Sequence, residues 1–262
     1  VYDGLTGRLI TTVIRPGKTP NAGEVLAVLK RVVKRLRRAW PDVQILLRAD
    51  SHHTKPKVME WMEANGIVYV TGLSPNKRLA RQFSGALETA RRLHSQTWKE
   101  TRLYRSGWYS ADSWNGTYRR VICRVLVTAN GVDTRYIATS FEKGRAKFLY
   151  EQLYSGRGNA ELMIKDHKLD LGSSHASCHT ATANQFRLFL HSAAYTIMHR
   201  LRALLKGTEL ENARFSTLQL RLLKIAARVE IRKRRIRYHL PLEFPLKHIF
   251  AKLATIFVPM RV

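Results

Sequence analysis

The sequence predicts an α/β fold in which helices flank a sheet, a β-rich insertion interrupts it, and the C-terminal part is helical. Three observations predict this fold. Strand-like and helix-like segments alternate over residues 1–75, an order typical of a mostly parallel sheet. Apolar and polar residues then alternate between turn dipeptides over about 100–140, as in β-hairpins. From Lys143 onward, apolar residues return to helical spacing.

The first 75 residues contain five expected elements. β-prone residues over Arg8–Arg15 predict a strand, which the turn at Pro16 closes. Over Ala22–Ala39, apolar residues at helical spacing with Lys and Arg between them predict an amphipathic helix with a basic outer face. A buried strand, a helix and another strand follow, over Val43–Leu47, Lys55–Asn65 and Ile67–Gly72. The buried strand leads into Asp50, so a carboxylate is expected at its carboxyl end.

Beyond Pro75 the pattern changes. A basic helix is expected over Lys77–Leu93, and the dipeptides Asn115-Gly116 and Asn130-Gly131 predict tight turns between strands. The remaining elements are three helices and a basic strand, near Lys143–Lys168, Ala181–Leu205, Phe215–Val229 and Ile231–Leu240.

The charge restricts the choice of partner. With 46 Lys and Arg against 19 Asp and Glu, the net charge of +27 repels itself unless the protein works beside an anion. Nucleic-acid phosphate is the abundant anion, and anionic membrane and acidic protein are its rivals. The basic residues are spread along the chain, which favours a long nucleic-acid footprint over one membrane-bound helix. Two cysteines and no apparent leader or membrane span predict a protein of the bacterial cytoplasm.

A set of polar residues at fixed intervals occupies residues 154–168: Tyr154, Arg157, Glu161, Lys165 and Lys168. On an ideal helix they lie within roughly 80° of arc. The spacing of Tyr154, Arg157, Glu161 and Lys168 resembles the signature around the third catalytic carboxylate of DDE-type insertion-sequence transposases. Leu47–Ser51 resembles the strand that ends in the second catalytic Asp of that family. Further similar segments extend the resemblance over nearly the whole chain: Tyr2–Gly4, Arg15–Gly17, Tyr69–Leu73, and Asn184, Arg187, Ala194 and Tyr195.

The resemblance implies a ribonuclease H-like fold, a mixed sheet flanked by helices. Residues 1–75 would form the first part of the catalytic domain, 76–142 the insertion, and 143–262 the second part with a helical, basic C-terminal region. The implied activity is metal-dependent DNA strand cleavage and strand transfer at transposon ends. Asp50 and Glu161 would be catalytic and would bind two Mg²⁺ ions, for which Mn²⁺ can substitute.

The resemblance also implies partners. Tyr154, Arg157 and Lys168 would hold phosphates near the cut end, with Lys165 beside them on the same helical face. The double-stranded DNA would be the terminal inverted repeats and the target, bound by a homodimer associated with the nucleoid. In this family the first catalytic Asp precedes the Tyr2–Gly4 segment. We therefore expect an N-terminally incomplete transposase that cannot cut DNA alone; Asp3 is the alternative for the missing ligand.

Two further groups of residues are candidates for contact with DNA. Trp114 lies beside an expected hairpin turn and is a candidate to stack on an unpaired base; a place in the core is the alternative. The basic run near the C-terminus is expected to contact phosphates, and a solvated edge strand is its alternative. Its candidate residues are Arg232, Arg234 and Arg235.

Several histidines are candidate metal ligands. His52 and His53 directly follow Asp50 and Ser51, and they are either metal or phosphate contacts or solvated loop residues. A second group does not have the paired spacing of structural zinc sites: His167, His175, Cys178 and His179.

Two other functions fit parts of the sequence. One is a nuclease that places Pro-Asp on one strand and Asp-x-Lys on the next, formally fitted by Pro41-Asp42 and Asp166–Lys168. The other is a basic, non-catalytic DNA-binding remnant whose carboxylates are structural. Dependence on a divalent metal distinguishes a transposase from such a binding protein.

Overall fold

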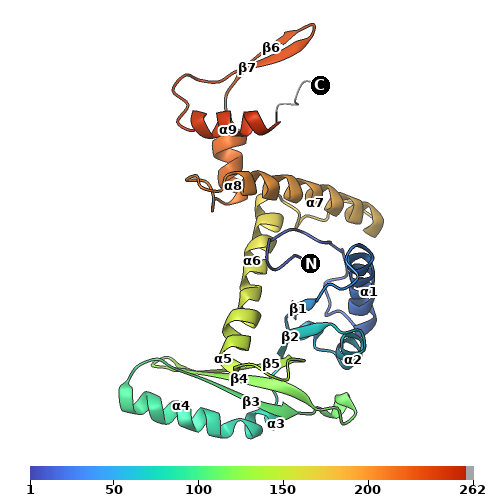
Figure 1. The fold of residues 1–262 in the computed structure, drawn as a ribbon, viewed down its shortest axis with the longest axis vertical. Coiled ribbons are helices and arrows are strands. Elements are labelled where there is room, and N and C mark those ends of the chain that lie inside the picture. Colours follow the sequence, from blue (N-terminus) through green and yellow to red (C-terminus); the bar gives the residue numbers. More distant parts are fainter. Residues whose placement is uncertain (258–262) are drawn as a thin grey trace. The chain divides into compact units, whose positions relative to one another are not determined.

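A computed structural model describes residues 1–257 and divides the chain into two compact units (Figure 1). One unit, Gly17–Gly158, contains the main sheet and is called the sheet unit. The other combines Val1–Pro16 with Asn159–Val262 and is called the helical unit. The last five residues of the expected C-terminal region, 258–262, lie outside the described residues.

The sheet unit is built on a 5-stranded sheet with the order β1-β2-β5-β4-β3. The first pair of strands is parallel, and all the other neighbours are antiparallel. The sheet is therefore mixed, which confirms the fold that the resemblance implies, and the parallel order expected over residues 1–75 is limited to the β1–β2 pair. The bounds are β1 Leu46–Ala49, β2 Val68–Leu73, β3 Thr101–Tyr109, β4 Arg119–Thr128 and β5 Gly131–Thr139. Because β5 pairs directly with β2, the expected insertion extends the sheet.

The two Asn-Gly dipeptides lie at the connections between these strands, and Gly131 is already the first residue of β5. Thr128 pairs with Gly131, so Ala129 and Asn130 form a two-residue turn, as the sequence predicts. Asn115 and Gly116 belong to a longer connection between β3 and β4, and both have positive φ, 50° and 76°. Asn and Gly adopt this backbone conformation more readily than other residues, which explains their place here.

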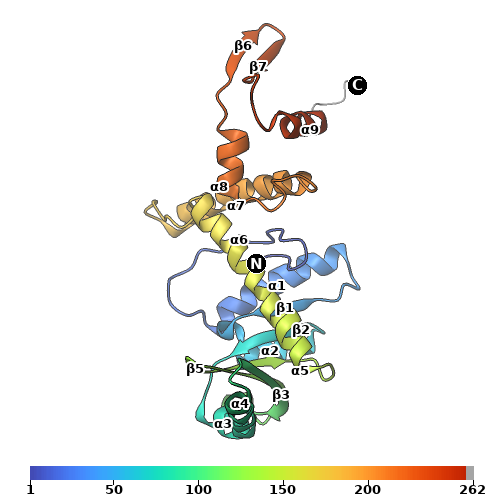
Figure 2. The same cartoon turned by 90° about the vertical axis from the view of Figure 1, so that its left-hand side faces the viewer.

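Helices cover one face of the sheet. Helix α1 spans Ala22–Ala39, as predicted, and buries Val25, Leu29 and Val33. The other helices on this core are α2 Pro56–Ala64, α3 Lys77–Gln82 and α4 Ser84–Thr97. The helix expected over Lys77–Leu93 is therefore two helices. The break is at Phe83, whose side chain is buried in the core and contacts Tyr136 at 5.9 Å between ring centroids. Figures 1 and 2 show α4 along the β3–β4 part of the sheet.

A helical run of changing pitch follows β5, and its first part covers the opposite face of the sheet, where Leu149 and Tyr150 pack on residues of the central strands. It begins with α5 (Ala146–Phe148) and continues as a π-helical segment, η3 (Leu149–Tyr154), and a 3₁₀ segment, η4 (Ser155–Arg157). Helix α6 (Gly158–Lys165) and a second π-helical segment, η5 (Asp166–Asp170), complete it. Since the pitch changes, the constant angle assumed for residues 154–168 does not apply.

The helical unit has its own core around Tyr195 and Phe215, whose rings lie 5.3 Å apart. Its helices are α7 Ala181–Leu204, α8 Phe215–Leu218, η6 Gln219–Leu223 and α9 Lys247–Phe257. The helix expected over Phe215–Val229 ends at Leu223, because the chain turns into β6 at Arg228. Strands β6 (Arg228–Arg232) and β7 (Arg235–His239) form an antiparallel hairpin where one strand was expected over Ile231–Leu240. Among the described residues, no helix is long and apolar enough to cross a membrane.

The strand expected over Arg8–Arg15 is absent from the described structure. Leu9 forms an isolated bridge with Tyr2, and farther along the polar groups of the segment bond to side chains of α7. The amide of Ile14 donates to Gln185 Oε1 at 2.8 Å, and the Thr12 and Ser192 hydroxyls are 2.8 Å apart. The expectation of a strand is wrong because helix side chains replace a neighbouring strand as hydrogen-bond partners.

An ion pair joins α2 to β4 within the sheet unit and gives a testable prediction. The Arg119 side chain is 3% exposed and donates to both Glu63 oxygens, at 2.7 and 2.8 Å. Burial raises the pKa of Glu63, but hydrogen bonds from Arg119 and Tyr69 lower it more. Glu63→Ala leaves a buried guanidinium without its carboxylate and should lower the free energy of unfolding by about 3 kcal/mol at neutral pH.

The loss in free energy of unfolding caused by Glu63→Ala should depend on pH. Because the pKa of Glu63 is lower in the folded state, its contribution is present above the unfolded value, near 4.5, and disappears as the pH falls through the folded value. Chemical denaturation at pH 7 and pH 3 measures this. Glu60→Ala, at an exposed site on the same helix, is the matched control. Equal losses for the two variants would contradict the prediction.

Candidate functional site

Asp50 lies where β1 ends and caps the short 3₁₀ helix η1 (Ser51–His53). Its carboxylate accepts hydrogen bonds from the His52 amide at 3.0 Å, His53 Nδ1 at 2.9 Å and His52 Nδ1 at 3.3 Å. The hydrogen bond from His53, followed by that from His52, holds the pKa of Asp50 well below its usual range, against the opposing effect of burial. The side chain is 45% exposed. Asp50 is therefore an ionised, accessible oxygen donor at a strand end.

The two histidines are not simply solvated loop residues. Each contacts the Asp50 carboxylate through a ring nitrogen, so both lie directly beside the candidate site. They restrain the carboxylate and supply positive charge whenever they are protonated.

Gly72, in β2, joins the Asp50 turn to Tyr154. The Thr54 hydroxyl donates to the Gly72 carbonyl, which ties the residues after Asp50 to this strand. A Cβ atom on Gly72 would lie 2.8 Å from the Tyr154 hydroxyl oxygen and 3.0 Å from the Ser51 amide nitrogen. Tyr154 therefore reaches the backbone beside Asp50, and only a glycine leaves room for this approach.

A second tie connects β1 to the segment that carries Tyr154. Arg48 Nη1 donates to the Leu153 carbonyl at 3.3 Å, and a Cβ on Gly156 would lie 2.6 Å from the same nitrogen. The Arg157 guanidinium lies 5.4 Å from the centre of the Tyr154 ring. The sheet unit thus brings together Asp50, Tyr154 and Arg157 near the irregular turns η3 and η4. Such π-helical and 3₁₀ turns within helices often mark functional sites.

Sequence reasoning missed Gly72, Arg48 and Thr54. A glycine inside a predicted strand is a known sign of close backbone approach, and that signal was available for Gly72. No local pattern marks Arg48 or Thr54, because their partners lie on elements distant in the sequence.

Glu161 and Lys165 lie on α6, and Lys168 lies on η5. These three side chains are exposed and belong to the helical unit, whereas Asp50, Tyr154 and Arg157 belong to the sheet unit.

The nearby Asp166 has a different environment. It is buried, and Arg202 Nη1 lies 2.8 Å from its Oδ2 while Arg214 Nε lies 3.7 Å from its Oδ1. The nuclease alternative needs Asp166 in an open site beside Lys168, and this burial argues against it.

The donors of the helical unit do not suggest zinc. His167 is buried, its Nδ1 is 2.6 Å from the Ser173 hydroxyl, and burial first of all lowers its pKa. Asp3, the alternative for a third carboxylate, accepts from the Leu5 amide and the Thr6 hydroxyl within its own turn. Within residues 1–257, no group of three or more His, Cys, Asp and Glu side chains could hold a metal ion. Asp50 fits a hard cation as a single ligand, but the described residues of either unit contain no complete set.

Trp114 does not have the exposure expected of a stacking residue. It is 2% exposed, lies edge-on to Tyr109 at 5.5 Å, and has the Arg119 guanidinium 5.2 Å from its ring centre. The ring is part of the core, the alternative weighed above, and this burial leaves it no open face for a base. The exposed indoles among the described residues are Trp40, Trp98 and Trp108, and Trp98 is 86% exposed at a left-handed C-cap with φ of 53°.

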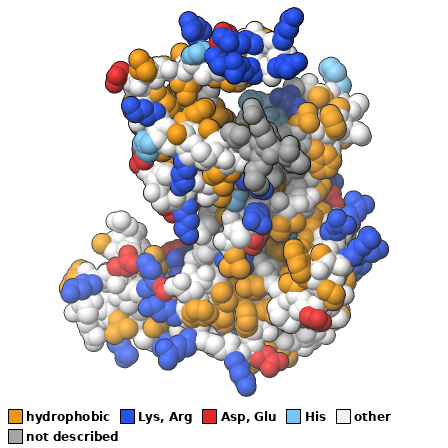
Figure 3. Space-filling model, turned by 45° about the horizontal axis from the view of Figure 1, so that its top comes forward, with side chains coloured by type: hydrophobic (Ala, Val, Ile, Leu, Met, Phe, Trp, Pro, Cys, Tyr) orange, Lys and Arg blue, Asp and Glu red, His pale blue; other side chains and the backbone are white. Residues whose placement is uncertain are grey.

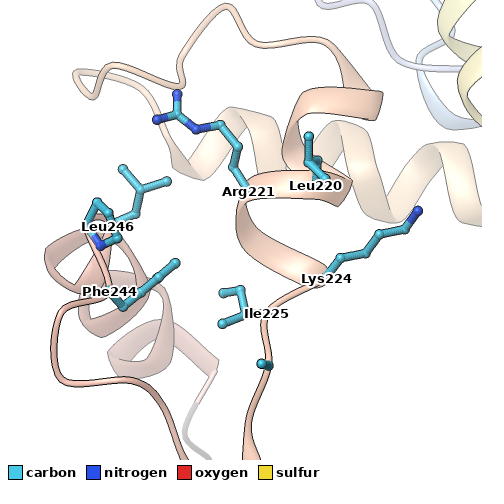
Figure 4. Close-up of a pocket in the computed structure, with 8 residues that line it drawn as sticks. Leu220, Arg221, Lys224, Ile225, Phe244 and Leu246 are labelled. Atoms are coloured by element: carbon cyan, nitrogen blue, oxygen red, sulfur yellow. The ribbon is translucent and has the colours of Figure 1, made fainter.

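The basic run near the C-terminus forms the end of the β6–β7 hairpin. Arg232 pairs with Arg235 across the strands, and Arg234 lies in the turn. All three side chains are exposed, and Arg232 also contacts Glu230 at 2.7 Å. An open hollow of about 290 Å³ lies elsewhere in the helical unit, with Arg221 and Lys224 beside apolar side chains from residues 244–246 (Figure 4). None of the predicted site residues lines it.

A comparison with protein families finds a match over almost the entire chain. No curated protein matches it. The family described as transposase DDE domain group 1 matches residues 1–261. This match agrees with the mixed sheet flanked by helices described above. The chain therefore belongs to the transposase DDE domain group 1 family.

Proposed function

We propose that this protein cleaves DNA strands and transfers them at the ends of an insertion sequence, in a reaction that depends on a divalent metal. The observation that supports this most directly is the Asp50 carboxylate, kept ionised at a strand end and packed near Tyr154 and Arg157. Family membership supports the class of reaction, and these contacts support a role for Asp50, Tyr154 and Arg157 in it.

Each candidate residue has a role that its chemistry supports. Asp50 and Glu161 would be ligands of Mg²⁺ or Mn²⁺, since both ions prefer carboxylate oxygens. The bound metal would activate the attacking oxygen and stabilise the leaving one. Tyr154 and Arg157 would orient a DNA phosphate beside Asp50, through a hydroxyl and a guanidinium that lie on one segment. Lys165 and Lys168 are exposed cations that would bind phosphates of the same substrate.

The DNA partner would be the terminal inverted repeats together with a target duplex. The hairpin residues Arg232, Arg234 and Arg235 would contact its backbone outside the reacting phosphate. By analogy with the family, two protomers would act together on paired ends. Association with the bacterial nucleoid would follow from affinity for DNA of any sequence.

Glu161 should be needed for cleavage and not for binding. Glu161→Gln removes the anionic ligand but keeps the side-chain size, so metal-dependent nicking should fall by at least about 100-fold while DNA affinity changes less than twofold. The substrate is a plasmid that carries the coding sequence and several hundred flanking base pairs, incubated with Mg²⁺ or Mn²⁺. Glu243→Gln, also exposed in the helical unit, is the control.

The outcomes separate enzyme from binding protein. Metal-dependent nicking that survives Glu161→Gln would contradict the role of Glu161. If the unsubstituted protein bound the plasmid but never nicked it, the incomplete transposase expected from the sequence or the non-catalytic DNA-binding remnant would be the better description.

Gly72 should keep the Asp50 turn and Tyr154 in place. Gly72→Ala puts a methyl group against the Tyr154 hydroxyl and the Ser51 backbone, so nicking should fall about 10-fold or more while plasmid affinity is retained. Gly107→Ala, in β3 of the same sheet, is the control because its methyl would meet mainly the flexible Gln82 amide and the Phe83 ring. Tyr154→Phe should weaken the effect of Gly72→Ala by removing the clashing oxygen. Additive losses in the double variant would argue against this packing.

The hairpin should contribute to the salt dependence of binding. Each phosphate neutralised on duplex DNA contributes about −0.9 to the slope of log affinity against log salt. Changing Arg232, Arg234 and Arg235 to Gln should therefore make the slope shallower by about 2 to 3, measured by fluorescence anisotropy between 50 and 200 mM salt. The control changes three arginines that are all paired with carboxylates: Arg78, Arg102 and Arg135. Of the three hairpin arginines, Arg232 alone has such a partner among the described residues. Equal slopes for the two triple variants would contradict a specific role of the hairpin.

A further inference from the structure

A row of cations runs along the outer face of α1 in the sheet unit. All of its side chains are exposed, and together they define the α1 cation row: Lys30, Arg31, Lys34, Arg35 and Arg38. At 1.5 Å per residue the row extends about 12 Å along the helix. Figure 3 shows Lys and Arg side chains as the prevalent charges on the face in view.

Few negatively charged groups neutralise the α1 cation row. Within the described part of the chain, no ion pair to a carboxylate is found for any of its members. The single acid of the helix, Glu24, is used in the capping box with Asn21 at the other end. The helix dipole favours a cation in the last turn, which accounts for Arg38 but not for Lys30 or Arg31 near the middle.

The arrangement opposes helix stability. Lys30 and Lys34, Arg31 and Arg35, and Lys34 and Arg38 are spaced i, i+4, where like charges repel and destabilise a helix. We therefore expect the row to have a function only when an external anion neutralises its positive charge.

Other cations of the sheet unit differ. Arg37, one residue before Arg38, donates to the Asn65 carbonyl and so joins α1 to the end of α2. Arg78 lies 2.9 Å from Asp112, and Arg119 is held by Glu63. The cations that stabilise this fold therefore have partners within it, and the members of the α1 cation row face solvent.

The identity of the anion follows from the rest of the helix. The apolar side of α1 is buried through Val25, Leu29 and Val33, so it is unavailable for insertion into a bilayer, as a membrane-surface helix requires. A length of about 12 Å is similar to the width of the major groove of duplex DNA, across which phosphates face each other. An extended polyanion with regularly spaced phosphates therefore fits the row better than a lipid surface.

We propose that the α1 cation row binds the phosphate backbone of duplex DNA, independently of base sequence and through residues other than the candidate catalytic residues and those of the β6–β7 hairpin. The choice of DNA as the polyanion rests on the proposed function. The location of the contact rests on the exposure, spacing and unpaired state of these side chains among the described residues.

The test uses the whole chain and a variant in which Arg31, Lys34 and Arg35 are changed to Gln, a residue that keeps helix propensity. Its affinity for a 30-base-pair duplex of arbitrary sequence, without metal, should fall about 10-fold at 150 mM salt, and the salt slope should become shallower by about 2 to 3. The melting temperature should rise, because the repulsion along α1 is removed. The control is the triple change of the paired Arg78, Arg102 and Arg135, which should lower the melting temperature and reduce affinity less.

The α1 variant and the control are expected to change the melting temperature in opposite directions, so a loss of DNA affinity in the α1 variant is not explained by a loss of stability. An unchanged duplex affinity in the α1 variant, or a loss no larger than in the control, would overturn the proposal. Vesicles of phosphatidylcholine with 30% phosphatidylserine serve as a second probe. Binding to them as tight as to duplex, and lost in the α1 variant, would assign the row to membrane instead. Because the assay contains no metal and measures no cleavage, an inactive enzyme would contradict the proposed function and leave this inference standing.

Discussion

The parallel pairing of β1 with β2 is the constraint on which the rest of the sheet unit depends. Leu46 pairs with Val68 and Ala49 with Thr71, so the two strands end together at one edge. Asp50 follows the first strand there, and Gly72 lies beside it on the second. The helix between the strands, α2, covers one face, and Tyr154 approaches from the other. A shift of one residue would turn Gly72 to the other face and replace it with a side chain where Tyr154 needs open backbone.

The scarcity of carboxylates gives those that are present distinct uses. Glu63 is held by the buried Arg119, Asp133 by Arg124 and Arg135, and Asp166 by Arg202. Because each of these acids is held by a guanidinium group, its charge stabilises the fold. Asp50 differs, because its hydrogen-bond donors are imidazole rings and one backbone amide in its own turn. The Asp50 side chain is also 45% exposed, so its carboxylate stays accessible to an external cation.

Local patterns predicted those features that depend on local physics. The bounds of α1 follow from apolar spacing and from the Asn21 and Glu24 capping pair, both encoded within a few residues. The Asp50 strand end and the Asn130 turn were predicted for the same reason. The strand expected at Arg8–Arg15 was wrong because its partners, Gln185 and Ser192, are more than 170 residues away. The burial of Trp114 and the pitch changes around Tyr154 likewise depend on distant packing, which a linear pattern does not contain.

The net charge of +27 becomes understandable once cations are sorted by their partners. In each unit, some arginines are neutralised internally, such as Arg119 by Glu63 and Arg202 by Asp166, and these hold elements together. Each unit also exposes a cationic surface, the α1 cation row in one and the β6–β7 hairpin in the other. Surface cations of this kind destabilise the isolated protein by repulsion and gain free energy when counterions are released from DNA. Under the proposed function, the excess charge is therefore a property of the DNA-bound state and not of the isolated protein.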